Sequence, residues 1–355
     1  MTESVMISEA TSTQSSLKAV SASASQVKPN FIFVLADDLG YNSIGYEEHD
    51  LTSVTPYLTS LAKGIHRNLQ LSRILIDISF FSPLYIDGIV LTNYYAQEVC
   101  TPSRASLLTG RYPISLGMQY DEVLSDGMWG LNISETLLPE VLRDTNSYKN
   151  YAIGKWNLGH YTPLMLPTAR GFDQFIGFMN GENYYWSKRY PLKSEFTDFA
   201  YADTDCHTSY EMSDMQTYST FLYRDKAIQA IGEHNFDLHP MFLYLSAQAV
   251  HDPFNDIEGS YNAGIPKDYL NEEVYEYIQK NVIGASRQQY AMALNLLDGS
   301  IKAIVEAMVA KGQMDNTYLI FASDNGGCYS AGGRNGDLRG SKGSLFEGNY
   351  ASFYC

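Results

Sequence analysis

Short apolar runs alternate with longer segments of helical periodicity, and this alternation limits the fold more than any other feature of the chain. The run NFIFVLA at residues 30–36 is continuously apolar, as expected for a strand buried on both faces. Alternating strands and helices are typical of a mainly parallel sheet with helices on both faces. We therefore predict an α/β fold with a mainly parallel, mixed sheet. The expected strands span residues 30–36, 88–95, 148–153, 241–250 and 317–323, and the expected helices span residues 56–63, 103–108, 137–144, 217–233 and 286–311.

Chemically active side chains stand at the ends of four predicted strands. They are Asp37 and Asp38, Lys155, His251, and Asp324 with Asn325. In open α/β sheets, ligands bind outside the carboxyl ends of the strands, where loops converge. Each residue alone could belong to an ordinary turn, where Asp and Asn are common. Their recurrence at four strand ends favours one site that contains three carboxylates, an amide, an imidazole and an ammonium group.

The charge balance restricts the ligands of such a site. The chain has 40 acidic residues against 24 Lys and Arg, and its net charge of −16 argues against binding to nucleic acid or to an anionic membrane. An anionic substrate would need a local positive centre. Three carboxylates and a carboxamide are oxygen ligands, which Ca²⁺ and Mg²⁺ prefer, so a bound hard cation could supply that centre.

The sharpest local motif is CTPSRASLLTGR at residues 100–111. This segment resembles the type I sulfatase family, which carries C-x-P-S-R followed by L-T-G-R. The resemblance implies that Cys100 is converted to formylglycine, whose hydrated aldehyde is the nucleophile. Without the resemblance, Cys100 would be interpreted as a small buried apolar residue, which is the commonest state of a free cysteine.

Other segments match the same family in order, from about residue 29 to residue 348. They are FVLADDLG at 33–40, GKWNLG at 154–159, PTARGFD at 167–173, QAVH at 248–251, SDNGG at 323–327 and LRGSK at 338–342. The segments near the end of the chain look most similar to the arylsulfatase B group. The resemblance implies an alkaline-phosphatase-like sulfatase core.

The resemblance also implies a role for each site residue. The metal ligands would be Asp37, Asp38, Cys100, Asp324 and Asn325, with Ca²⁺ expected in preference to Mg²⁺. The catalytic residues would be Cys100, Arg104, Lys155, His251 and Lys342. In this scheme Arg104 and Lys155 orient the formylglycine, and His251 and Lys342 contact the sulfate ester.

The implied activity is hydrolysis of an aryl or sugar sulfate. The expected partners are a small-molecule or glycan sulfate ester and, during maturation, the formylglycine-generating enzyme; neither nucleic acid nor membrane insertion is expected. Two alternatives stay open. One is a phosphonate or phosphodiester hydrolase with the same nucleophile, and the other is a sulfatase-like pseudoenzyme or inactive fragment that binds sulfated ligands without cleaving them.

One position departs from the family motif G-K-W-H-L-G. The histidine of that motif is Asn157 here. An amide can form hydrogen bonds but cannot accept a proton near neutral pH, so a base for the second half of the reaction would be lost. We therefore expect slow or absent turnover with a trapped sulfated enzyme. His160 is a possible substitute, although an ordinary loop histidine is the favoured interpretation.

The domain organisation is expected to comprise a disordered leader at residues 1–29 and a sulfatase catalytic domain at residues 30–350. Residues 64–86 interrupt the family pattern, and we interpret them as an atypical insert from a retained intron or gene-model error, or else as a packed insertion. The family continues into a smaller antiparallel-sheet domain, which we expect to be truncated here. The leader lacks the pattern of a signal peptide, whereas the resemblance implies a secretory route to a lysosomal or extracellular location.

Overall fold

The computed structural model describes residues 28–45, 49–63, 88–192, 196–203, 208–209, 216–256 and 264–354. The predicted leader lies outside these ranges except for residues 28 and 29, and the insert at residues 64–86 lies wholly outside them. The expectations about both segments, and about a truncated second domain, therefore stay predictions.

Within the described ranges, the strands form one nine-stranded sheet in the order β2-β9-β8-β1-β7-β3-β4-β5-β6. The five strands from β8 to β4 in this order are parallel, and antiparallel strands flank them on both sides. The predicted mainly parallel, mixed sheet is confirmed. The bounds are β1 Asn30–Ala36, β2 Leu91–Tyr95, β3 Lys149–Lys155, β4 Gln174–Phe178, β5 Ala200–Asp203, β6 Thr208–Ser209, β7 Met241–Ser246, β8 Thr317–Ser323 and β9 Ala351–Tyr354.

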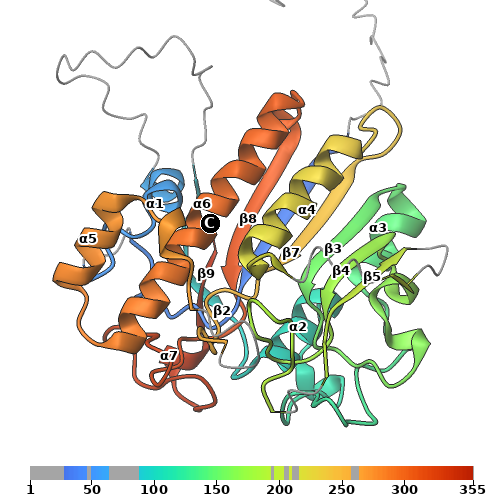
Figure 1. The fold of residues 1–355 in the computed structure, drawn as a ribbon. Coiled ribbons are helices and arrows are strands. Elements are labelled where there is room, and N and C mark those ends of the chain that lie inside the picture. Colours follow the sequence, from blue (N-terminus) through green and yellow to red (C-terminus); the bar gives the residue numbers. More distant parts are fainter. Residues whose placement is uncertain are drawn as a thin grey trace, which may run out of the picture.

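Helices cover both faces of the sheet, and Figure 1 shows α4 and α6 lying along one of them. On β1, Ile32 and Val34 belong to the core shared with α1, α4, α5 and α6, whereas Phe33 and Leu35 belong to the core shared with α2 and α3. This alternation follows from the two-residue period of a strand. The bounds are α1 Pro56–Lys63, α2 Cys100–Thr109, α3 Leu138–Asn146, α4 Ser219–Glu233, α5 Glu272–Asn281, α6 Ala285–Ala310 and α7 Glu347–Tyr350.

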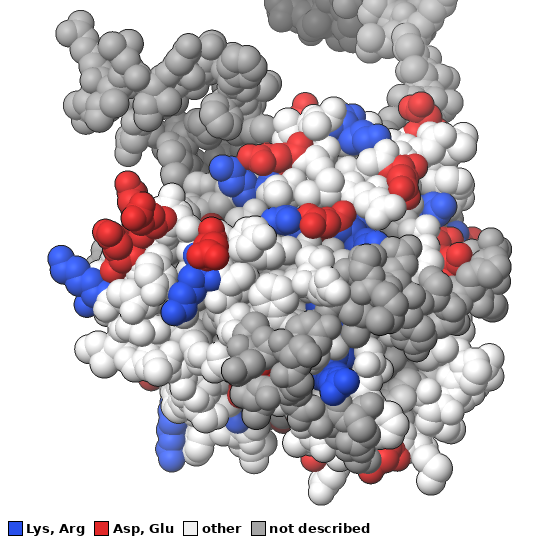
Figure 2. Space-filling view, in the orientation of Figure 1, with Lys and Arg blue, Asp and Glu red and all other residues white. Residues whose placement is uncertain are grey.

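The face shown in Figure 2 carries acidic and basic side chains over the same helices, so the excess of acid is not gathered there in one patch. Among the helices that the structure describes, none combines the length and apolar character required to cross a membrane.

Several element boundaries differ from the sequence predictions. The strand predicted at residues 241–250 ends at Ser246. Residues 247–250 remain buried, but their backbone turns to pair with Leu35 and Asp37 instead of extending the sheet. The helix predicted from residue 103 already begins at Cys100. The sequence analysis also missed β4 and α5.

The N-terminus of α1 is capped by a residue distant in sequence. The hydroxyl of Thr55, the residue before this helix, accepts a hydrogen bond from the Gly45 amide. The amides of Tyr57 and Leu58 donate instead to the two carboxylate oxygens of Asp298, at 3.0 and 2.7 Å. Asp298 lies on α6, so the contact joins α1 to the longest helix of the described structure.

We expect Asp298→Ala to lower the free energy of unfolding by about 1–2 kcal/mol, because two helix amides, one buried and one partly buried, lose their acceptor. Urea unfolding would measure the change. Glu306→Ala, on the same helix, is the matched control: its exposed pair with Lys302, at 3.8 Å, should contribute little. Equal stability of the two variants would contradict the capping role.

Candidate active site

The polar strand ends predicted from the sequence meet at one place in the fold. Because β1, β3 and β8 are parallel, their carboxyl ends lie at the same edge of the sheet. The N-terminus of α2 and the segment after β7 contribute further side chains. The residues that contact one another there are Asp37, Asp38, Cys100, Arg104, Lys155, His251, Asp324, Asn325 and Lys342. All of them are buried except Lys342, which is partly exposed.

Cys100 is the first residue of α2 and is fully buried. Its Sγ atom lies 3.3 Å from Oδ1 of Asp37 and 3.5 Å from Oδ1 of Asn325. Burial, together with the charges of Asp324 and Asp37, raises the pKa of the Cys100 thiol well above its ordinary value. The unmodified thiol is therefore held protonated, which is unsuitable for a thiolate nucleophile.

Asp37 forms ion pairs with two basic side chains beneath this cysteine. Nζ of Lys155 donates to Oδ2 of Asp37 at 2.8 Å, and Nη2 of Arg104 lies 3.6 Å from Oδ1. Burial alone would raise the pKa of Asp37, but Lys155, His251 and Arg104 lower it below its ordinary value. Asp37 is therefore ionised and oriented at neutral pH.

Arg104 connects the ends of three elements. Its Nη2 and Nε atoms donate to Oδ2 of Asp324 at 2.6 and 3.1 Å, and Nη1 donates to the Ser246 hydroxyl at the end of β7. Burial opposes the charge of Arg104, but Asp324 and Asp37 raise its pKa overall. Arg104 follows Cys100 by about one turn of α2, so these bonds also fix the position of the start of that helix.

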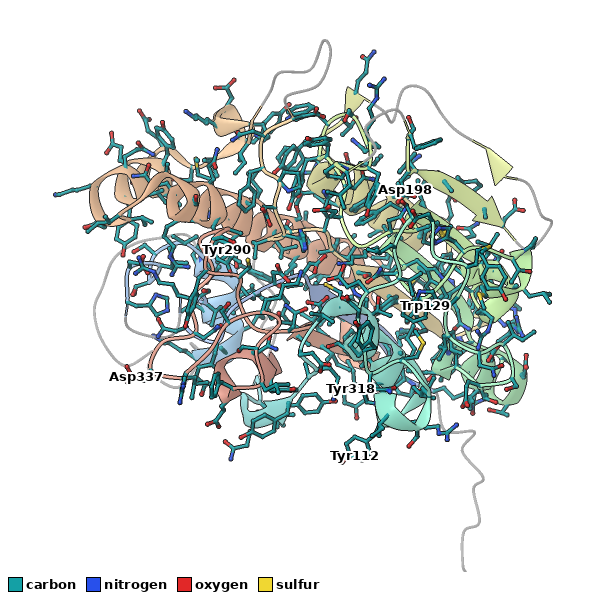
Figure 3. All side chains as sticks on the ribbon, turned by 90° about the horizontal axis from the view of Figure 1, so that it is seen from below. Tyr112, Trp129, Asp198, Tyr290, Tyr318 and Asp337 are labelled. Atoms are coloured by element: carbon teal, nitrogen blue, oxygen red, sulfur yellow. The ribbon has the colours of Figure 1, made fainter. Side chains whose placement is uncertain are left out.

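Asp38 is held on the other side of the site. Its Oδ1 atom accepts from Nδ2 of Asn325 at 2.7 Å and lies 3.0 Å from Nζ of Lys342. The same Nζ atom lies 2.9 Å from Nε2 of His251. The backbone of Asp38 is left-handed, with φ of 60°. Tyr290, labelled in Figure 3, lies on α6, and its buried hydroxyl stabilises this turn by donating to the Asp38 carbonyl at 3.2 Å.

The donor atoms suit a hard divalent cation. One ligand atom each from Asp37, Asp38, Cys100 and His251 lies within 4.8 Å of the others. Oδ1 of Asn325 adds an oxygen beside Cys100. Asp324, also predicted as a ligand, forms an ion pair with Arg104 at 2.6 Å. Carboxylate and amide oxygens fit Ca²⁺ or Mg²⁺, so Asp37, Asp38 and Asn325 are well placed to hold such a cation.

Asn157 lies next to α2 and is completely buried. Its Oδ1 atom accepts from the Thr101 hydroxyl at 2.9 Å, and Nδ2 donates to the Val123 carbonyl at 3.4 Å. His160, considered as a substitute base, has its Nε2 atom 3.2 Å from the Ser125 carbonyl. This backbone contact supports the interpretation of His160 as a loop residue.

Glu122 is a site residue that the sequence analysis missed. It lies between two described helices, in a loop without a recognisable motif, and its Oε1 atom is 3.6 Å from Nζ of Lys342. Burial would raise the pKa of Glu122, but Lys342, Lys155 and His251 lower it to about 2. Only the folded structure reveals this contact, because Glu122 and Lys342 are distant in sequence.

A family model described as Sulfatase matches residues 29–352. Arylsulfatase J of Mus musculus is 32% identical over 322 residues, which cover 90% of this chain and 46% of that protein. N-acetylgalactosamine-6-sulfatase of Homo sapiens is 28% identical over 347 residues, which cover 92% of this chain and 56% of that protein. The chain thus spans about half the length of these relatives.

A solved structure with the same fold is that of Ps i-CgsB. It is 28% identical to this chain with a TM-score of 0.72, and the match covers 92% of this chain and 65% of that one. The same protein has also been solved in complex with k-i-k-neocarrahexaose.

Proposed function

Because this chain belongs to the sulfatase family, we propose that it hydrolyses sulfate esters with a formylglycine made from Cys100 and a bound divalent cation. The observation that carries the proposal is the position of Cys100, buried at the start of α2 within 3.5 Å of Asp37 and Asn325. Ca²⁺ is the expected cation, with Mg²⁺ less favoured, as the family resemblance implies; the oxygen ligands themselves suit either ion.

The proposed residue roles follow the geometry. Asp37, Asp38 and Asn325 would hold the cation. Asp324 would help to position Asp38, because Oδ1 of Asp324 accepts a hydrogen bond from the Asp38 amide at 3.2 Å. Arg104 and Lys155 would fix the position of residue 100. His251 and Lys342, at 2.9 Å from each other, would face the ester.

The formylglycine and the cation would supply part of the chemistry, and the side chains around them would supply the rest. When present, the hydrated aldehyde supplies a nucleophilic hydroxyl and the cation supplies positive charge. Lys155 and Lys342 stabilise negative charge that develops on the sulfuryl oxygens, because their ammonium groups are already oriented by carboxylates. His251 or Lys342 donates a proton to the departing oxygen. Asn157 cannot remove a proton beside residue 100, so we expect the release of sulfate to be slow.

The relatives give no support to a protein that binds without cleaving, since those named above are sulfatases. The phosphonate or phosphodiester hydrolase is the remaining alternative. We propose a glycan or a small aryl sulfate as the substrate, which the oligosaccharide complex of a related structure supports. Maturation would require the formylglycine-generating enzyme, and hence a secretory route to a lysosomal or extracellular location.

The proposal predicts hydrolysis that depends on a cation. We expect EGTA to reduce 4-nitrophenyl sulfate hydrolysis by about 100-fold or more, because charge stabilisation by the cation is lost. Ca²⁺ should restore activity better than Mg²⁺. At a Ca²⁺ concentration about 100 times its Kd, thermal unfolding should show a stabilisation of about 2.7 kcal/mol. Activity unaffected by the chelator, or faster hydrolysis of 4-nitrophenyl phosphate, would contradict the proposal.

A further inference from the structure

Glu122 brings a negative charge into a site built to receive an anion. Its carboxylate lies 3.6 Å from Lys342, a residue that also contacts Asp38 and His251. The side chain is 21% exposed, so solvent screens this charge only partly. Neither the metal ligands nor the proposed proton donors include it, and the proposed reaction has no step that uses it.

The surrounding loop is shaped to admit this carboxylate. A Cβ atom at Gly181 would overlap Oε2 of Glu122, whereas the glycine leaves that space free. The same Cβ position lies 3.7 Å from Nδ2 of Asn157. Glu122 is thus enclosed between Lys342 on one side and the Gly181 loop, beside Asn157, on the other.

The charge of Glu122 is permanent over the range in which esters would be hydrolysed. Its pKa is lowered to about 2 by Lys342, Lys155 and His251 in spite of burial. Glu182, which follows Gly181, interacts electrostatically with Glu122 and His251, but burial raises the pKa of Glu182. Of these two carboxylates, Glu122 is therefore the one whose pKa favours the ionised form.

Coulomb repulsion from a fixed carboxylate scales with the charge of the bound ester. A sulfate ester carries one negative charge, whereas a phosphate monoester, whose second pKa is about 6, carries nearly two at pH 8. We propose that Glu122 is a specificity-determining residue of this site and favours singly charged esters over doubly charged phosphate monoesters. This inference rests on the proposed function, because it takes the site as the one that receives the sulfate ester.

A purely structural role would have a different consequence. If Glu122 only positioned Lys342, its neutralisation would disturb the ammonium group and weaken every anion to a similar degree. If Glu122 instead repels anions according to their charge, its neutralisation changes the ratio of affinities between singly and doubly charged anions. The ratio is therefore the informative quantity.

The test is calorimetric binding at pH 8 with saturating Ca²⁺, in a Cys100→Ala background that prevents turnover. The probes are phenyl sulfate and methyl phenyl phosphate, each with one negative charge, and phenyl phosphate with nearly two. In Glu122→Gln we expect the ratio of phenyl sulfate affinity to phenyl phosphate affinity to fall about tenfold. The affinity of methyl phenyl phosphate should change in parallel with that of phenyl sulfate, because charge and not phosphorus is sensed.

Asp121→Asn is the matched control, since it removes the same charge from an exposed neighbour and retains the oxygen that accepts from the Glu122 amide. It should leave all three affinities unchanged. An unaltered ratio in Glu122→Gln, or the same change in Asp121→Asn, would overturn the inference alone. Failure of both the Cys100 chain and its Asn157→His variant to hydrolyse 4-nitrophenyl sulfate would overturn the proposed function alone, whereas failure of all three probes to bind would overturn both.

Discussion

Replacing Cys100 with alanine is expected to abolish sulfate ester hydrolysis, with a loss of about 10⁴-fold or more, as for removal of a covalent nucleophile. The Cys100 side chain lies against Asp37 and Asn325, neither of which carries a hydroxyl that could replace it. Initial rates on 4-nitrophenyl sulfate would measure the loss. The fold should persist, since the substitution removes only one small buried atom.

Cys328 offers the matched control for this variant. It is a free, partly exposed cysteine whose Sγ atom lies 3.1 Å from the Ser330 hydroxyl. Cys328→Ala should retain full activity. Peptide mass spectrometry across residue 100 should show the mass change from –CH₂SH to –CHO, and no such change at residue 328. Activity that survives in Cys100→Ala, or activity with an unmodified thiol at residue 100, would contradict the proposed nucleophile.

Restoring histidine at position 157 is expected to raise turnover by about 10²–10⁴-fold, the usual contribution of a general base. Asn157 is buried beside Thr101 on the first turn of α2, so an imidazole there would lie close to residue 100. The backbone at residue 157 has φ of 55°, a conformation that histidine tolerates better than most residues. Steady-state rates on an aryl sulfate would reveal the gain.

The control for this variant is His160→Asn. His160 contacts the Ser125 carbonyl, and its loss should leave turnover unchanged if it is an ordinary loop residue. A burst of product followed by slow turnover should accompany Asn157 and disappear in Asn157→His. No gain in Asn157→His, combined with a loss in His160→Asn, would show that the base had been assigned to the wrong residue.

Much of the site could be predicted because the relevant information is local in the sequence. An apolar run followed by Asp37 and Asp38 indicates both a buried strand and a polar strand end. Parallel pairing then brings separate strand ends together without any knowledge of individual contacts. The meeting of Asp37, Lys155 and Asp324 is a consequence of that topology. Their roles in catalysis and metal binding stay predictions.

The features that were missed depend on contacts between distant segments. Asp298 caps α1 from 240 residues away, so no local capping pattern could identify it. Residues 247–250 are as buried as a strand, but their backbone turns to pair with Leu35 and Asp37. Glu122 has no motif, and only the approach of Lys342 makes it part of the site.

The site can form only when β1 pairs with β7 and β8 in the correct register. Asp37 and Asp38 leave β1 toward different partners, Lys155 for the first and Lys342 for the second. A slip of one residue would move β1 by about 3.3 Å and exchange its two packed faces. Such a slip would displace Asp37 from Lys155, whose ammonium group lies 2.8 Å from its carboxylate in the correctly aligned chain. After refolding, the return of the ion pairs of Asp37 and Asp38 would therefore indicate the correct register of β1 more sensitively than the return of helix content.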